Sequence, residues 1–189
     1  MPRLSALLAA ATVTALLASC SESGTLGGPG PTAPADARAE GGTRRIEILD
    51  ACDPTSFNAA IGAGTCTRPG GLSFASFIGE LTAKGEVGAW RFAPSNNVQA
   101  QVGQMLLAIN RGGEVHTFSE VEEFGGGIVP LLNDLSHNTE VAPECLALAP
   151  SDFIPPGGTA SDEVEEPGTE RYQCCIHPWM RAVVTARGE

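Results

Sequence analysis

The chain has 189 residues, of which 42% are hydrophobic, and this suits one modest folded domain better than two domains or a disordered chain. Its 23 glycines and 14 prolines, with short apolar runs between them, favour a loop-rich and largely β architecture. The net charge of −11 has no basic cluster to offset it, which argues against nucleic acid as a partner because such binding neutralises phosphates.

Residues 1–19 have the features of an export signal. Arg3 precedes the apolar run Leu4–Leu17, which is too short and wrongly flanked for a membrane-spanning helix. The ending LASC resembles the lipobox of bacterial lipoproteins, which implies lipidation at Cys20; an ordinary cleaved secretory signal is the alternative. We therefore expect an exported protein, lipid-anchored to a bacterial membrane and facing the periplasm or cell exterior, where disulfides can form.

Residues 20–43 are predicted to be a flexible tether, because they contain almost nothing apolar to bury. An N-terminal cap with one helix is expected over 44–89. That helix is predicted within 72–85, where Ser73 can cap its start and Gly85 can end it. Its apolar residues fall on one face: Leu72, Phe74, Phe77, Ile78 and Leu81.

From Trp90 onward the hydrophobic period changes to two, which predicts short strands separated by turns. The strands are expected at 98–102, 105–110, 114–118, 171–175 and 182–186. The predicted fold class is therefore all-β, an antiparallel sandwich over 90–189. The poorly periodic segment 125–156 predicts a long excursion loop with at most one short helix.

A thiolate, an imidazole and a thioether follow one another at intervals of three residues, at Cys174, His177 and Met180. A loop with this spacing can bring all three side chains to one ion. Two histidines, one cysteine and a weak axial methionine form a blue-copper ligand set. The second histidine is expected to be His116, which lies in an apolar strand after a turn, whereas His137 lies in a polar loop.

These motifs resemble the cupredoxin family, and within it the amicyanin and plastocyanin type, over about residues 90–186. The stretch 172–181 is similar to the family's C-terminal ligand loop, and 114–118 is similar to the strand that carries the first ligand histidine. The resemblance implies a Greek-key β-sandwich that holds one copper ion, cycling between Cu(I) and Cu(II). The ligands it implies are His116, Cys174, His177 and Met180.

The same resemblance implies that His177 presents its ring edge near the surface as the electron port, beside Pro178 and Trp179. Thr117 stands where the family usually has an asparagine that ties the two ligand loops together. The segment 119–155 is longer than in small cupredoxins.

Cys174 is assigned as the ligand because it gives the C-x-x-H spacing, and Cys175, next along a strand, faces the opposite side. Setting aside Cys20 and Cys174 leaves four cysteines that allow three pairings. A Cys52–Cys66 bridge closes the shortest loop, which contributes about 3 kcal/mol in the chain-entropy estimate. That bridge would leave Cys145 to pair with Cys175.

The predicted function is copper-dependent electron transfer by a monomer, with a cytochrome or cuproenzyme as redox partner. No enzyme is expected, because the chain has no nucleophile motif and a four-ligand site has no open position. The alternatives are copper capture, delivery or sensing, a metal-free interaction domain with an oxidised Cys174, and zinc at the same residues.

Two acidic stretches follow the first histidine and precede the cysteine strand. Glu120, Glu122 and Glu123 are expected to form a solvated acidic face, although a carboxylate ligand to copper is the alternative. The stretch 162–166 is a candidate for steering the protein toward a basic partner.

Overall fold

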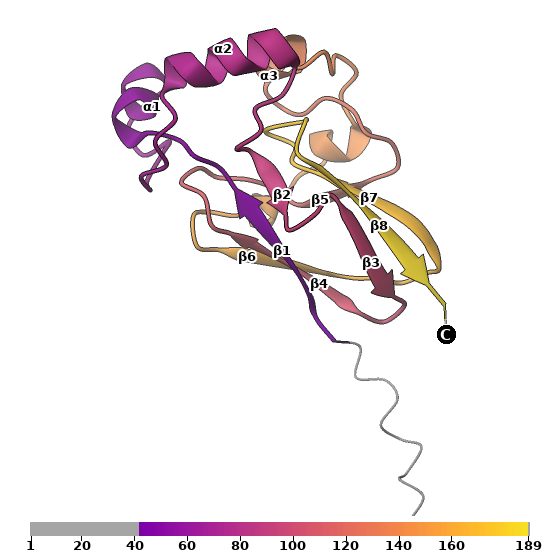
Figure 1. The fold of residues 1–189 in the computed structure, drawn as a ribbon. Coiled ribbons are helices and arrows are strands. Elements are labelled where there is room, and N and C mark those ends of the chain that lie inside the picture. The colour runs from indigo at the N-terminus through magenta and orange to yellow at the C-terminus, as the bar shows by residue number, and fades with distance from the viewer. Residues whose placement is uncertain (1–41, 189) are drawn as a thin grey trace, which may run out of the picture. The chain divides into compact units, whose positions relative to one another are not determined.

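The computed structural model describes residues 42–188, so the predicted signal, Cys20 and the tether before residue 42 lie outside the described residues. Within them, eight strands form two four-stranded sheets (Figure 1). The first sheet, in the order β2-β1-β4-β6, contains Arg91–Ala93, Arg44–Leu49, Met105–Asn110 and Thr159–Glu163. The second, in the order β3-β8-β7-β5, contains Asn97–Gln101, Arg181–Arg187, Gly168–Gln173 and Ser119–Val121.

The two sheets bury one shared core. Side chains of β4 and β8 alternate between buried and half-buried positions, as expected for strands with one face toward a core. Both sheets contribute fully buried residues, among them Ile46, Leu106, Tyr172 and Val184. The predicted all-β sandwich is therefore confirmed.

The strand directions differ from the predicted antiparallel arrangement, because each sheet contains one parallel pair. β1 lies parallel to β4, and β3 lies parallel to β8. Parallel neighbours need a long connection, and the chain between the members of each pair is long enough to provide one. Periodicity shows which face of a strand is buried, but it does not show the direction of its neighbour.

The helical cap begins later than predicted and contains two helices where one was predicted. Residues 44–49 form β1 inside the first sheet, and the segment that follows has two helices, α1 (Pro54–Ala60) and α2 (Phe74–Lys84). α2 confirms the predicted helix: the Ser73 side chain accepts from the Ser76 backbone, and Gly85 ends the helix at φ 74°. α1 buries only Phe57, so its sequence has too little apolar periodicity to predict a helix.

The excursion holds more regular structure than predicted. It contains α3 (Pro130–Leu135) and two short 3₁₀ helices, Pro143–Leu146 and Pro150–Asp152. The Asn133 side chain anchors it by bonding both the N–H and the C=O of Gly127, at 2.7 and 2.8 Å. Because polar side chains hold this segment, hydrophobic periodicity does not reveal it.

The strand predicted at 114–118 is reduced to one isolated bridge between His116 and Ile154. Conversely, β6 forms at Thr159–Glu163 and so takes in the start of the acidic stretch 162–166. No helix within residues 42–188 is both long enough and apolar enough to cross a membrane.

Two disulfides are present, Cys52–Cys66 and Cys145–Cys175, which is the pairing that the short-loop estimate favours. The first lies in the cap, and the second joins the excursion to the residue that follows Cys174. In the described part of the chain, Cys174 is the free cysteine, and it is buried.

Candidate metal centre

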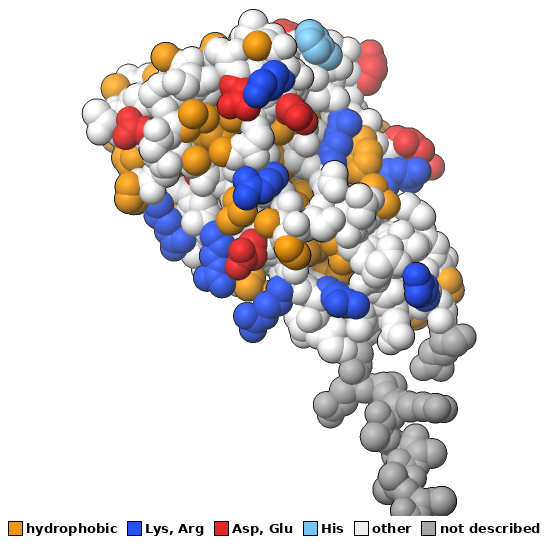
Figure 2. Space-filling view, in the orientation of Figure 1, with side chains coloured by type: hydrophobic (Ala, Val, Ile, Leu, Met, Phe, Trp, Pro, Cys, Tyr) orange, Lys and Arg blue, Asp and Glu red, His pale blue; other side chains and the backbone are white. Residues whose placement is uncertain are grey.

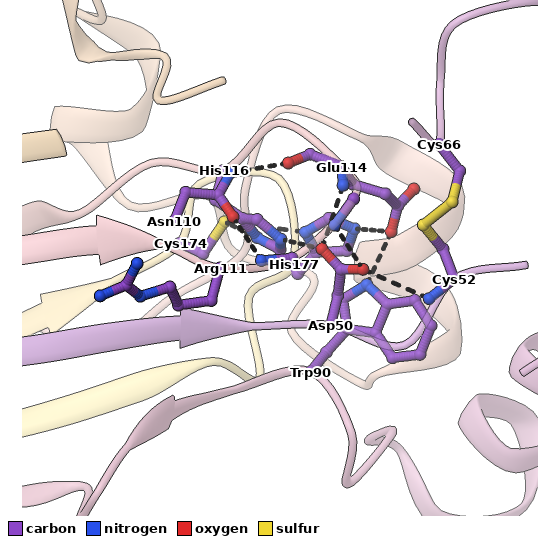
Figure 3. A network of polar contacts seen from close by, with 12 residues as sticks. Asp50, Cys52, Cys66, Trp90, Asn110, Arg111, Glu114, His116, Cys174 and His177 are labelled. Atoms are coloured by element: carbon purple, nitrogen blue, oxygen red, sulfur yellow. Dashed lines mark hydrogen bonds and ion pairs between the residues drawn. A yellow bond between two sulfur atoms is a disulfide. The ribbon is translucent and has the colours of Figure 1, made fainter. Parts of the chain in front are cut away.

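Three predicted ligands converge beneath the cap. The Cys174 Sγ lies 3.7 Å from the Nδ1 of His116 and 3.7 Å from the Nδ1 of His177 (Figure 3). One ligand atom from each of the three residues lies within 4.8 Å of the others. Their exposed fractions are 0% for Cys174 and His116 and 3% for His177, so the group is closed to solvent.

The first sheet and the excursion together position His116. Its backbone exchanges hydrogen bonds with Ile154, at 3.1 and 2.7 Å. The buried Asn110 side chain, at the end of β4, donates to the carbonyls of Glu114 and Ile154 and accepts from the N–H of Gly112. One amide side chain therefore supplies hydrogen-bond partners to the irregular backbone just before His116 and to Ile154, the residue that pairs with His116.

The other predicted ligands lie on one tight loop between β7 and β8. The N–H of Cys174 donates to the Met180 carbonyl at 3.0 Å, and the N–H of Met180 donates to the His177 carbonyl at 2.9 Å. These two bonds curl the chain as the three-residue spacing predicted. Met180 is 1% exposed and packs in the main core, but its place as an axial ligand stays a prediction.

Thr117 joins the two ligand segments. Its N–H donates to the Cys174 Sγ at 3.4 Å, and its hydroxyl accepts from the N–H of Cys175 at 2.8 Å. A side chain of different type thus makes the tie for which the resemblance implies an asparagine.

The electrostatics of the group favour a thiolate. Burial by itself raises the pKa of Cys174, but hydrogen bonds from His116 and His177 and their charges bring it well below its usual value. Burial likewise lowers the pKa of His116, but the hydrogen bonds with Asp50 and Cys174 raise it overall. A thiolate flanked by two imidazole nitrogens is a donor set that fits copper, because soft sulfur and imidazole ligands suit that metal.

Two carboxylates that sequence reasoning did not assign to the site lie behind the histidines. The Asp50 Oδ2 is 3.0 Å from the Nε2 of His116, and the Glu114 Oε2 is 3.6 Å from the Nε2 of His177 (Figure 3). Asp50 also accepts from the N–H groups of Cys52, Gly113 and Glu114.

The pKa values of the two carboxylates respond differently to the site. Burial raises the pKa of Asp50, but the hydrogen bonds from His116 and from the backbone lower it to about 2. Burial raises the pKa of Glu114 overall, although the charge of His177 and the hydrogen bond from Trp90 act to lower it. No local sequence signal marks Asp50, which lies 66 positions before His116.

A second group of potential metal ligands, Asp50, Cys52 and Glu114, does not form a separate site. Cys52 is in a disulfide and therefore offers no thiolate. The remaining predicted candidates lie elsewhere: His137 is exposed, and Glu120, Glu122 and Glu123 are exposed and outside the ligand group.

His177 is 3% exposed, so its ring edge is not open to solvent as the resemblance implies. The Trp179 ring lies edge-on to His177 at 5.5 Å, and the Phe77 ring of α2 contacts both Trp179 and Trp90, at 5.9 and 4.8 Å. Trp90 in turn donates to the Glu114 carboxylate at 2.7 Å. The ring that lies on His177 therefore belongs to Trp179 of the same loop, and α2 packs on that ring through Phe77.

No protein-family model and no curated protein matches the sequence. Among solved structures, a purple cupredoxin from Nitrosopumilus maritimus is 18% identical with a TM-score of 0.42, covering 76% of this chain and 98% of its own. Oxidised plastocyanin from Dryopteris crassirhizoma is 14% identical with a TM-score of 0.39, and the match covers 76% of this chain and 100% of the plastocyanin. A reduced amicyanin mutant is 22% identical with a TM-score of 0.33, and the match covers 49% of this chain and 70% of the amicyanin. With TM-scores this low, the metal site is inferred from its own geometry.

Replacing Thr117 with valine should lower the free energy of unfolding by about 1–3 kcal/mol, because the buried N–H of Cys175 would lose its acceptor. Urea denaturation of the full protein measures this change. Ser119→Ala is the control, since it removes only the hydroxyl that donates to Thr117. Equal losses in the two variants would show that Thr117 does not tie the ligand segments.

Proposed function

We propose that this protein binds one copper ion through His116, Cys174 and His177 and acts as an exported electron carrier, not an enzyme. The observation that carries the proposal is the buried convergence of a free cysteine sulfur with two imidazole Nδ1 atoms, each 3.7 Å from the sulfur. Copper bound there would supply a one-electron couple between Cu(I) and Cu(II). The thiolate and imidazole donors favour copper over hard cations.

The chain holds these donors in a fixed arrangement. Backbone hydrogen bonds close the loop between Cys174 and Met180, and the bridge to Ile154 fixes His116. Ligands that are already in place need little rearrangement when the metal changes charge, which suits rapid electron exchange. We assign Met180 as the weak axial ligand, because it closes this loop and is buried in the same hydrophobic core as Cys174.

The covering of His177 supports electron transfer over copper delivery. A metal that is handed to another protein must exchange ligands, and here His116, Cys174 and His177 are all buried from solvent. The metal-free alternative needs an oxidised Cys174, but the structure pairs the other four described cysteines with one another and leaves Cys174 as a thiol. The two disulfides fit an oxidising compartment, and we assign membrane anchoring to lipidated Cys20.

An acidic face is the docking surface that we assign to a basic redox protein. It consists of Glu120, Glu144, Asp162, Glu165 and Glu170, which line adjoining hollows. Burial and then the charges of Asp162, Glu165 and Glu144 raise the pKa of Glu120, as expected where like charges gather.

The acidic face lies against the strand that leads to the ligand cysteine. The Tyr172 hydroxyl, two residues before Cys174, lies 2.9 Å from the Asp162 carboxylate and 3.1 Å from the Glu170 carboxylate, and it can donate its one proton to either. Figure 2 shows a different face, on which Lys and Arg side chains gather over the first sheet and apolar side chains over α1 and α2. The uneven distribution of charge would orient a basic partner as it approaches.

Cys174→Ala should abolish the intense visible absorption of the oxidised copper protein, because that absorption comes from the sulfur–Cu(II) bond. Copper reconstitution of the full protein with a visible spectrum and a metal assay measures this. The double variant Cys145→Ala/Cys175→Ala should retain the band, since Cys175 is in a disulfide. Retention of the band in Cys174→Ala would refute the ligand assignment.

Met180→Gln should retain copper and lower the reduction potential, because an axial ligand tunes the potential more than it holds the metal. Redox titration of the visible band provides the measurement. Complete loss of copper, or an unchanged potential, would count against the axial role.

Electron exchange with a small basic redox protein should slow about tenfold or more as salt rises from ~0.01 to ~0.3 M, because salt screens steering charges. The variant Glu120→Gln/Glu170→Gln should be slower at low salt and less sensitive to salt. Glu86→Gln, an exposed substitution outside the acidic face, is the control. Stopped-flow rates that do not depend on salt would exclude this docking surface.

A further inference from the structure

We propose that the carboxylates of Asp50 and Glu114 are positioning residues that set the reduction potential of the copper centre. This inference deepens, and rests on, the proposed copper site. Each carboxylate faces the ring nitrogen of a ligand histidine that points away from the thiolate. Neither belongs to the ligand set, so each would act through a histidine.

The orientation of the two imidazoles determines where their protons lie. Both rings turn Nδ1 toward Cys174, and both turn Nε2 toward a carboxylate. A neutral imidazole that binds a metal through Nδ1 carries its proton on Nε2. Each carboxylate therefore faces an Nε2–H group, to which it can bind by a hydrogen bond or by charge attraction. Such a partner fixes the orientation of the ring and raises the basicity of its ligating nitrogen.

Asp50 acts through a hydrogen bond. Its Oδ2 lies 3.0 Å from the Nε2 of His116, and the two side chains are 1% and 0% exposed. The register of β1 on β4, which pairs Ile48 with Asn110, brings Asp50 beside the turn that precedes His116. Gly112 is required there, because a side chain at that position would overlap the Asp50 carboxylate.

Glu114 acts through its charge. The 3.6 Å between its Oε2 and the Nε2 of His177 is too long for a hydrogen bond, but the side chain is only 8% exposed and unscreened by water. The Trp90 indole N–H holds the carboxylate in place at 2.7 Å. Among the described residues, the ion pairs of both carboxylates are with these two histidines.

The sign of the effect follows from charge. Cu(II) carries one more positive charge than Cu(I), so nearby buried anions stabilise the oxidised state more than the reduced state. The two carboxylates should therefore lower the reduction potential. A purely structural role would change stability and leave the potential as it is.

Glu114→Gln in the copper-loaded full protein is the decisive variant. Glutamine keeps the volume and an oxygen acceptor for Trp90, and it removes the charge. We expect the equilibrium between Cu(I) and Cu(II) to shift about tenfold toward Cu(I). This shift corresponds to a rise of ~59 mV in the reduction potential for a one-electron couple. The exposed Glu163→Gln on β6 is the control and should leave the potential unchanged.

Redox titration of the visible band measures the potential of each variant, and urea denaturation measures its stability. A potential for Glu114→Gln equal to that of Glu163→Gln would overturn the role of Glu114, whatever happens to stability. The proposed function would survive that result, because the wild-type band would remain. Failure of the wild-type protein to bind copper would instead refute the proposed function.

Asp50 needs a different measurement. In Asp50→Asn the amide NH₂ would face backbone N–H groups that now donate to the carboxylate, so the variant would lose hydrogen bonds as well as charge. Nitrogen–proton NMR of the wild-type Cu(I) protein, which is diamagnetic, reports the proton directly. We expect the His116 Nε2 to carry a proton that exchanges slowly with water. An unprotonated or rapidly exchanging Nε2 would overturn the role of Asp50.

Discussion

The Asp50 carboxylate is the point at which the separate parts of this structure are joined. A buried carboxylate costs several kcal/mol of free energy unless hydrogen bonds replace the lost water. Asp50 meets this constraint with the backbone of Cys52, Gly113 and Glu114 and the ring of His116. The end of β1, the start of the cap, the turn after β4 and a ligand histidine therefore cannot move independently.

This junction makes the helical cap part of the candidate metal centre. Asp50 bonds both Cys52, at the start of the cap, and His116, while Phe77 of the cap packs on Trp179, the ring that lies against His177. Closure excludes water and strengthens each charge interaction inside the site. In the proposed function the two tasks would be separated, because copper would bind at the buried histidines and Cys174, while the proposed docking surface lies beside β7.

The local part of the site could be predicted from the sequence alone. Cys174 and His177 lie three positions apart, so a single tight loop brings them together, while the axial role of Met180 at the end of that loop stays a prediction. The apolar context of His116 distinguished it from His137, which is exposed. α2 was predictable because Ser73 and Gly85 mark its ends, and the alternating pattern of β4 and β8 shows which side chains face the core.

Only the tertiary structure decided the strand directions, the burial of His177 and the two carboxylates behind the histidines. The parallel pairing of β1 with β4 and the contact of Asp50 with His116 join residues that are far apart in sequence. Periodicity and spacing report on a residue's own neighbours along the chain. They carry no information about which distant segment will cover a site, because that depends on how the completed sheets and helices pack. The sequence by itself therefore determined the ligand loop and the sandwich, and packing decided what surrounds the ligands.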